Sequence, residues 1–297
     1  MTVQLDTVAS PQVSRRPRRR GNMVTRALRT TTTKIGLGLT LVILLIAFLG
    51  PLVAPHSPTE FVGVPFAKPG NGLLFGTDNL GRDVFSRFLS GGLVLMILAI
   101  LATVIGVGLG AAVGVQAAYS RGRVDDVLMR GGDVALAFPQ IVLALLFLSI
   151  IGPKLWLLVV MVAVGHLPRT ARVVRGAATA VVERDFVKAA EAVGIARWRI
   201  MLTEIVPNVT GTLGVEFGLR LTYSIGLLAG LNFLGLGLQP PAADWGLMIN
   251  ENRIALTVQP WPVLLPILAI AILTVGTNLV TDGLARASAG TDSGVES

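Results

Sequence analysis

The chain alternates long apolar runs with shorter polar segments. A helix that crosses the hydrocarbon core of a membrane needs about 17–25 mostly apolar residues, and its backbone must satisfy its own hydrogen bonds. The pattern therefore predicts membrane-spanning helices. The fourth run has only 14 residues, which is short for a span. The six apolar runs lie at 35–54, 91–119, 134–151, 155–168, 209–238 and 261–281.

The distribution of basic residues indicates how many runs span. With the N-terminus inside, nineteen of the 25 Lys and Arg residues fall in inside segments and five in outside segments, as the positive-inside rule requires. Seven lie between 169 and 199, a segment that would be outside if the fourth run did not cross. We therefore predict an all-α membrane protein of six spans with both termini in the cytoplasm, the fourth span being 155–172.

Composition agrees with a membrane protein and excludes several chemistries. The 297 residues are 53% hydrophobic and only 14% charged, with a mean hydropathy of +0.72, too apolar for a soluble domain. The absence of cysteine excludes disulfides, thiolate metal sites and a cysteine nucleophile. The net charge of +8 lies beside the spans, which argues against nucleic acid as the partner. We expect a basic cytoplasmic tail (1–34), a transmembrane domain (35–287) and a short cytoplasmic tail (288–297).

The basic tail contains RRPRRR at 15–20 and leads directly into the first run. Two interpretations of its arginines stay open. They orient the first span and do nothing else, or they also attract anionic headgroups at roughly 1 kcal/mol each.

Few side chains offer catalytic chemistry. His56 and His166 lie in segments on opposite sides of the membrane in this topology, so they cannot share a metal or acid–base site. Gly110 and Gly114 form a G-x-x-x-G spacing inside an apolar run with no preceding strand, which favours close helix packing over a dinucleotide loop. No phosphate loop of the form G-x-x-x-x-G-K-[ST] occurs. The sequence therefore predicts no catalytic site and no metal site.

One charged pair lies inside a predicted span. Glu216 and Arg220 are four residues apart, so they share a helical face, and Arg220 lies roughly 18 Å from the inner end of its span. An unpaired charge there would cost at least about 2.5–3.5 kcal/mol. Either the two residues form an intrahelical salt bridge that faces the bundle, or their face lines a translocation path.

A charged stretch, KAAEAVGIARWRIMLTEIVP at 188–207, separates the fourth and fifth spans. Its pattern predicts two short amphipathic helices joined at Gly194, the second ending where Pro207 prevents continuation. The stretch is then either an interfacial helix on lipid or a docking surface for another protein. The first apolar face contains Phe186, Ala189, Ala190 and Val193, and the second contains Trp198, Met201, Leu202 and Ile205.

Three segments resemble one family. Ala189, Ala190, Gly194 and Pro207 match the A-A-x-x-x-G…P pattern of the EAA loop of binding-protein-dependent ABC importer permeases. FGTDNLGRDVFSRFLSGG at 75–92 resembles the G-T-D-x-x-G-R-D-x-x-S-R signature of the dipeptide, oligopeptide and nickel permeases. NFLGLGLQPPAADWGLMI at 232–249 resembles their F-L-G-L-G-x-x-P-P-x-x-x-W-G segment. With the first span and the closing NLVTDGLARA, the resemblance covers about 34–287 and fits the C-type subunit.

The resemblance implies a type I ABC importer permease fold in the bacterial inner membrane. It implies four kinds of partner: a homologous B-type permease, two ATPase subunits, an extracellular substrate-binding protein and the lipid bilayer. ATP and Mg would bind to the ATPases, so this chain would hold no cofactor and would not be an enzyme. Short peptides are the expected cargo, with nickel or another small solute as the alternative. An ion-coupled carrier is the alternative from another class.

The resemblance also assigns site residues. In the family, the loop that corresponds to 182–207 forms a coupling helix that sits in a groove on the ATPase. Lys188 stands where the pattern has Glu, and Leu228 stands where many relatives carry an acidic residue. The implied coupling residues are Lys188, Ala189, Ala190, Glu191, Gly194, Arg197, Trp198 and Pro207. Outside, Asp78, Gly81, Arg82 and Asp83 are expected to form a salt-bridged turn or to contact the binding protein.

Overall fold

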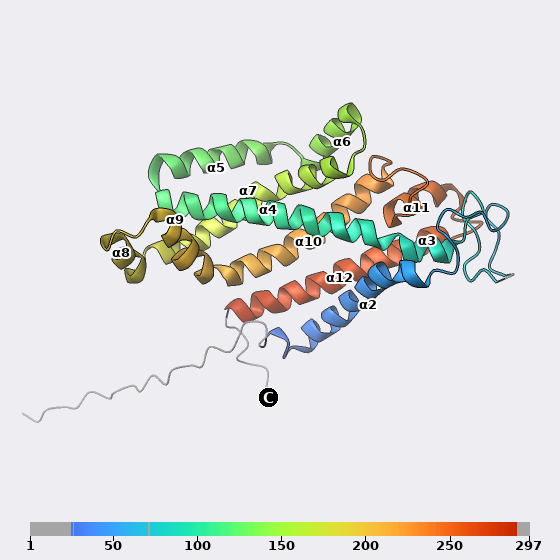
Figure 1. Cartoon of the computed structure of the whole chain (residues 1–297), viewed down its shortest axis with the longest axis horizontal. Coiled ribbons are helices and arrows are strands. Elements are labelled where there is room, and N and C mark those ends of the chain that lie inside the picture. Colours follow the sequence, from blue (N-terminus) through green and yellow to red (C-terminus); the bar gives the residue numbers. More distant parts are fainter. Residues whose placement is uncertain (1–24, 26, 71, 290–297) are drawn as a thin grey trace, which may run out of the picture.

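The computed structural model describes residues 25, 27–70 and 72–289 (Figure 1). Most of the tail expected at 1–34, and the end of the tail at 288–297, lie outside these residues. The described part is helical, with only isolated β-bridges. Its α-helices are α2 (Thr31–Val53), α3 (Val84–Ser90), α4 (Gly92–Ser120), α5 (Gly122–Ala137), α6 (Gln140–Ile151), α7 (Leu155–Val182), α8 (Asp185–Ala192), α9 (Arg197–Ile200), α10 (Thr210–Phe233), α11 (Trp245–Asn252) and α12 (Trp261–Ala289). Shorter turns are η1 (Met201–Ile205), η2 (Val206–Asn208) and η3 (Arg253–Ala255).

Four elements are long and apolar enough to cross a membrane: α2, the continuous stretch of α3 and α4, α7 and α12. The pair α5 and α6 also passes when taken together, although it bends by 74°. The 24-residue α10 has the length of a span but carries Glu216 and Arg220. The expected count of six spans therefore stays a prediction.

The expected third span, 134–151, is not one straight helix. Its first residues belong to α5, and the helix breaks at Phe138 and Pro139 before α6 begins. Proline lacks a backbone N–H and disfavours the helical conformation of the preceding residue, and Phe138 is accordingly extended.

Two other helices end at residues that differ from the predicted span boundaries. The helix of the fourth span continues to Val182, ten residues beyond the expected end at 172. The helix of the fifth ends at Phe233 instead of 238, because Gly235 takes a positive φ of 78° and turns the chain back. The N–H groups of Gly235 and Leu236 bond to the carbonyls of Asn232 and Leu231 in this turn.

Glycines hold α4 close to α7, and Figure 1 shows the two helices side by side. A Cβ atom at Gly110 would lie 2.8 Å from the carbonyl oxygen of Leu167, and one at Gly114 would lie 2.5 Å from that of Ala171. No side chain fits at either distance. The close packing predicted from the G-x-x-x-G spacing is therefore confirmed.

Two apolar clusters hold the bundle together. The larger joins α2, α4, α7, α10 and α12, with Leu95, Leu158 and Ile225 fully buried. The smaller joins Val115 of α4 and Val174 of α7 to Ile205 of η1. The smaller cluster fixes the segment after α7 to α4 and α7.

Candidate functional sites at the two ends of the bundle

The segment between α7 and α10 folds as helix, glycine turn and helix, as the sequence predicts. Helix α8 ends where Gly194 adopts a φ of 81°, a conformation that residues with a side chain rarely adopt. The N–H of Gly194 bonds to the carbonyl of Glu191, and that of Ile195 bonds to the carbonyl of Ala190. These bonds close the helix end and turn the chain toward α9. Figure 1 shows α8 and α9 together at one end of the bundle.

One side of this segment is buried and the other is bare. Val187, Ile200 and Ile205 are fully buried and anchor the segment to the bundle. Val193 is 81% exposed and Trp198 is 59% exposed. Several apolar side chains are left uncovered by the described residues, and we define five of them as the α8–α9 surface: Phe186, Ala189, Val193, Trp198 and Leu202.

Sequence reasoning found the bare face of α8 but missed its anchor. The pattern places Phe186 and Val193 on one face, and it gives Val187 no special role. Lys188, Glu191 and Arg197 are also exposed, so charged residues lie beside the α8–α9 surface. Pro207 follows η1, a wider π-turn, and a proline ring in this position prevents a regular α-helix from continuing.

The predicted turn at the opposite end exists. Arg82 donates from Nε to Asp78 Oδ2 over 2.7 Å, and the backbone N–H groups of Leu80 and Arg82 donate to Asp78 Oδ1. Gly81 has a φ of 81° and packs against the carbonyl of Gly63, so only glycine fits there.

Asp83 differs from the expectation, because it takes no part in the Arg82 pair. Its carboxylate accepts hydrogen bonds from the N–H groups of Phe85 and Ser86 and so caps the start of α3. His56 Nδ1 lies 3.5 Å from the same carboxylate. His166 lies within α7, bonded through Nε2 to Ser224, so the two histidines share no site.

Two ion partners were missed by sequence reasoning. Arg87 donates from Nη2 to Glu251 Oε2 over 2.8 Å, and Arg82 donates to the same oxygen over 3.1 Å. Arg87 Nε also lies 3.4 Å from Asp78 Oδ2. We call Asp78, Arg82, Arg87 and Glu251 the outer ion cluster; its side chains are all buried. Arg87 closes the quoted signature, but no local signal points to Glu251.

The outer ion cluster joins two segments that are distant in sequence, residues 55–91 and 239–260. Further hydrogen bonds follow the same seam. Trp245 donates from Nε1 to the carbonyl of Phe88 over 2.9 Å, and Gln259 donates to the carbonyls of Ala67 and Phe75. The two outer segments therefore form one unit, which includes α3 and α11 and lies at one end of the bundle in Figure 1.

Asp244 lies at the base of this unit and is fully buried. Its Oδ1 accepts hydrogen bonds from Asn232 Nδ2 at 2.8 Å and from the N–H of Leu247, which caps α11. Its Oδ2 has no partner among the described residues. Burial disfavours the charged carboxylate and raises the pKa of Asp244 to about 6.

The pair inside α10 has the geometry of an intrahelical salt bridge that faces the bundle. Arg220 Nε donates to Glu216 Oε2 over 3.0 Å, and Thr170 of α7 donates to the same oxygen over 3.1 Å. Both charged residues are buried. One turn further, Ser224 bonds to His166 and to Thr103 of α4. A polar face of α10 therefore meets α7 and α4.

Residues 105–289 match the family described as the inner membrane component of binding-protein-dependent transport systems. The chain belongs to this family. A peptide transport system permease protein of Brucella suis is 37% identical over 87% of this chain and 88% of its own length. The glutathione transport system permease protein GsiD of Pectobacterium atrosepticum is 34% identical over 82% of each chain. A chain of the inward-facing MetNI methionine ABC transporter aligns at 21% identity, with a TM-score of 0.48, over 65% of this chain and 94% of its own.

Membership of this family confirms two predictions made from the sequence, the fold class and the cellular location. The fold class expected from the sequence, an all-helical membrane permease, is confirmed by the family and by the helices of the described residues. The permease belongs in the bacterial inner membrane, as the family description states. Within the described part of the permease, no group of three or more His, Asp or Glu side chains is placed to hold a metal ion.

Proposed function

We propose that the permease is the membrane-spanning subunit of an ATP-driven importer that carries short peptides. The α8–α9 surface carries this proposal, because it is an apolar, helical surface left bare beside exposed charges while the other side of the segment is buried in the bundle. Bare apolar patches of this kind mark protein contacts. The peptide and glutathione permeases, which are 37% and 34% identical to it over the aligned residues, support the class of cargo.

The bare surface accounts for how an ATPase would act on the spans. An ATPase that binds Phe186 and Trp198 pulls on an anchored segment, because Val187 and Ile200 are fully buried and Ile205 packs in one cluster with residues of α4 and α7. Closure of two such ATPases would rock the spans between inward-open and outward-open states. ATP and Mg would bind to those subunits, so the permease itself is a non-catalytic subunit without a cofactor.

The outer unit supports the other expected partners. Its ion cluster fixes 55–91 against 239–260, while Phe61, Val64 and Ile254 stand exposed by 70% or more on its surface. We propose that an extracellular substrate-binding protein docks on this unit. A homologous B-type permease would complete the pair of membrane subunits and would bring the second ATPase.

The pair Glu216 and Arg220 is assigned first to holding α10 against α7. Its buried geometry and the hydrogen bond from Thr170 support this role. A place beside the translocation path is the second candidate, supported by Tyr223, which is 63% exposed while its ring lies 5.6 Å from the Arg220 guanidinium carbon.

The test is ATP-dependent uptake of labelled di- and tripeptides into proteoliposomes that contain the permease, its partner permease, the ATPases and the binding protein. We expect Gly194→Asp to lower uptake at least tenfold while ATP binding survives. Gly122→Asp is the matched control, since Gly122 also has a positive φ with open space around it. Uptake of nickel but not of peptides would show that the cargo is a metal ion. Peptide uptake without the ATPases would indicate an ion-coupled carrier.

A further inference from the structure

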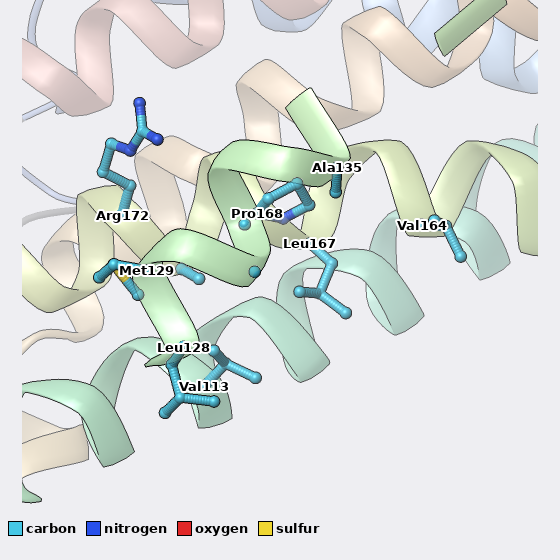
Figure 2. Close-up of a pocket in the computed structure, with 11 residues that line it drawn as sticks. Val113, Leu128, Met129, Ala135, Val164, Leu167, Pro168 and Arg172 are labelled. Carbon is cyan, nitrogen blue, oxygen red and sulfur yellow. The ribbon is translucent and has the colours of Figure 1, made fainter. Parts of the chain in front are cut away.

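Two adjoining hollows lie where α5 and α6 pack against α7. The larger has a volume of about 300 Å³ and is shown in Figure 2. The smaller has about 100 Å³ and shares Ala135, Val164 and Pro168 with it. We call the two together the α5–α7 groove. Its lining is apolar except for Gln140 and two arginines at its edge, Arg169 and Arg172.

The sequence creates this space in two ways. Gly131 and Gly132 remove side chains from the face of α5 that meets α7, and a Cβ atom at Gly131 would meet nothing within 4 Å. The break at Pro139 then tilts α6 away from the axis of α5. The remaining wall is Leu128 and Met129 of α5 with Leu167 of α7, as Figure 2 shows.

The groove lies at the depth of the inner leaflet. Helix α7 begins at Leu155, so Arg169 and Arg172 lie about 21 and 26 Å along it at 1.5 Å per residue. The hydrocarbon core is about 30 Å thick, so both arginines fall in its inner half or at its inner boundary. With the N-terminus inside, the groove opens beside the cytoplasmic headgroups.

The edge of the groove carries an arginine side chain, Arg169, that pairs with no carboxylate among the described residues. Arg169 is exposed and donates only to neutral oxygens, those of Gln140 at 2.9 Å and of the Gly165 carbonyl at 3.3 Å; no ion pair to Arg169 occurs in the described part of the chain. Arg172 pairs with Asp133, and both are exposed. An arginine at this depth is costly unless it reaches an anion, and its long side chain can extend to the headgroup region. Guanidinium groups bind phosphate in a bidentate manner.

We propose that the α5–α7 groove binds one anionic phospholipid of the inner leaflet. One acyl chain occupies the apolar hollow, and the phosphate meets Arg169 and Arg172. The exposed Arg169, which has no carboxylate partner among the described residues, favours an anionic headgroup over the apolar face of a neighbouring helix as the occupant.

The experiment measures lipid retention by native mass spectrometry. The purified full-length permease is incubated in detergent with equal amounts of phosphatidylglycerol and phosphatidylcholine of identical acyl chains. We expect one phosphatidylglycerol to be retained at least fivefold over phosphatidylcholine. Ala135→Phe, which fills both hollows, lowers that retention at least fivefold. Val134→Phe, its exposed neighbour that lines neither hollow, changes it less than twofold.

The charge is tested separately from the space. Arg169→Gln abolishes the preference for phosphatidylglycerol, Arg169→Lys restores it, and Arg123→Gln, an exposed arginine of α5 away from the groove, leaves it unchanged. Equal retention of both lipids by the wild type, or retention by Ala135→Phe equal to that of Val134→Phe, overturns the proposal. If Ala135→Phe does not fold, Gly131→Leu fills the larger hollow alone and serves in its place. Loss of the lipid from the assembled transporter would mean that the second permease covers the groove, and this result also overturns the proposal.

Discussion

Arg87 and Glu251 are 164 residues apart in the chain, yet their side chains form a buried ion pair with 2.8 Å between Nη2 and Oε2. The same Glu251 oxygen accepts a second bond from Arg82. Glu251 and Asp78 together therefore balance the charges of Arg82 and Arg87, which Asp78 alone would leave with an excess positive charge. Such an arrangement makes the outer unit sensitive to the loss of either acidic residue, because the arginines left behind would stay out of water.

Glu251→Gln should destabilise the permease by about 3–5 kcal/mol, the range found when one partner of a buried pair is removed. Chemical unfolding in detergent measures this change. Arg253→Gln, an exposed charge two residues away, is the control and should stay within about 0.5 kcal/mol of the wild type. Adding Arg87→Met to Glu251→Gln should recover part of the loss, since it removes the uncompensated charge. Equal stability of the two single variants would contradict the prediction.

Asp244 should give the stability of the permease a pH dependence near pH 6. Burial raises the pKa of Asp244 in the folded chain from 3.8 to about 6, so the folded state holds the proton over a range in which the unfolded chain has released it. Its contribution is fully present below about pH 4 and is lost as pH rises through 6. The two-unit shift corresponds to about 3 kcal/mol.

Asp244→Asn removes this titration and keeps an oxygen that can accept the bonds from Asn232 and Leu247. We expect its stability to exceed that of the wild type at pH 7.5 and the two to converge near pH 4.5. Thermal unfolding at a series of pH values gives the difference curve. A difference that does not change between these pH values would show that Asp244 titrates normally.

Gly114→Leu should separate α4 from α7. A side chain at Gly114 would meet the backbone of Ala171 at 2.5 Å, and neither backbone can move without disturbing the larger packing. Forced insertions of this kind cost about 1–3 kcal/mol. Gly108→Leu is the matched control, because Gly108 lies on the same helix with nothing within 4 Å of its Cβ position. The midpoint of chemical unfolding should fall for Gly114→Leu alone.

Local chemistry explains what the sequence could predict. A left-handed turn at Gly194, a helix end before Pro207 and close packing at Gly114 follow from the size of glycine and the missing N–H of proline. The salt bridge between Glu216 and Arg220 follows from helical spacing and the low polarity of the membrane. In each case the deciding contacts lie within one helix or between neighbouring residues.

The partners that the sequence could not supply are distant in the chain. Nothing in the residues around Glu251 identifies Arg87, since the two outer segments meet only after the spans between them have packed. The division of α8 into an anchor at Val187 and a bare face at Phe186 also depends on where the bundle lies. Both side chains are apolar and so suited to burial, and only the tertiary arrangement selects one.

Trp198 and Val187 therefore separate docking from folding. Trp198→Ala should leave the unfolding midpoint of the permease nearly unchanged, because its side chain is 59% exposed, while it weakens ATPase binding by about 10- to 100-fold. Val187→Asp should lower both the unfolding midpoint and the affinity for the ATPase, since it places a charge at a fully buried position. Titration of labelled ATPase against the detergent-solubilised permease, beside thermal unfolding, measures the two effects.

Trp156→Ala is the control for the loss of an exposed tryptophan. Trp156 lies at the start of α7, at the opposite end from α8, and is 57% exposed. The permease with Trp156→Ala should bind the ATPase as the wild type does. If Trp198→Ala also binds normally while its fold is intact, the bare face beyond Gly194 is not the ATPase contact. The other interpretation of the sequence, a helix lying on the lipid surface, then becomes the better account of this segment.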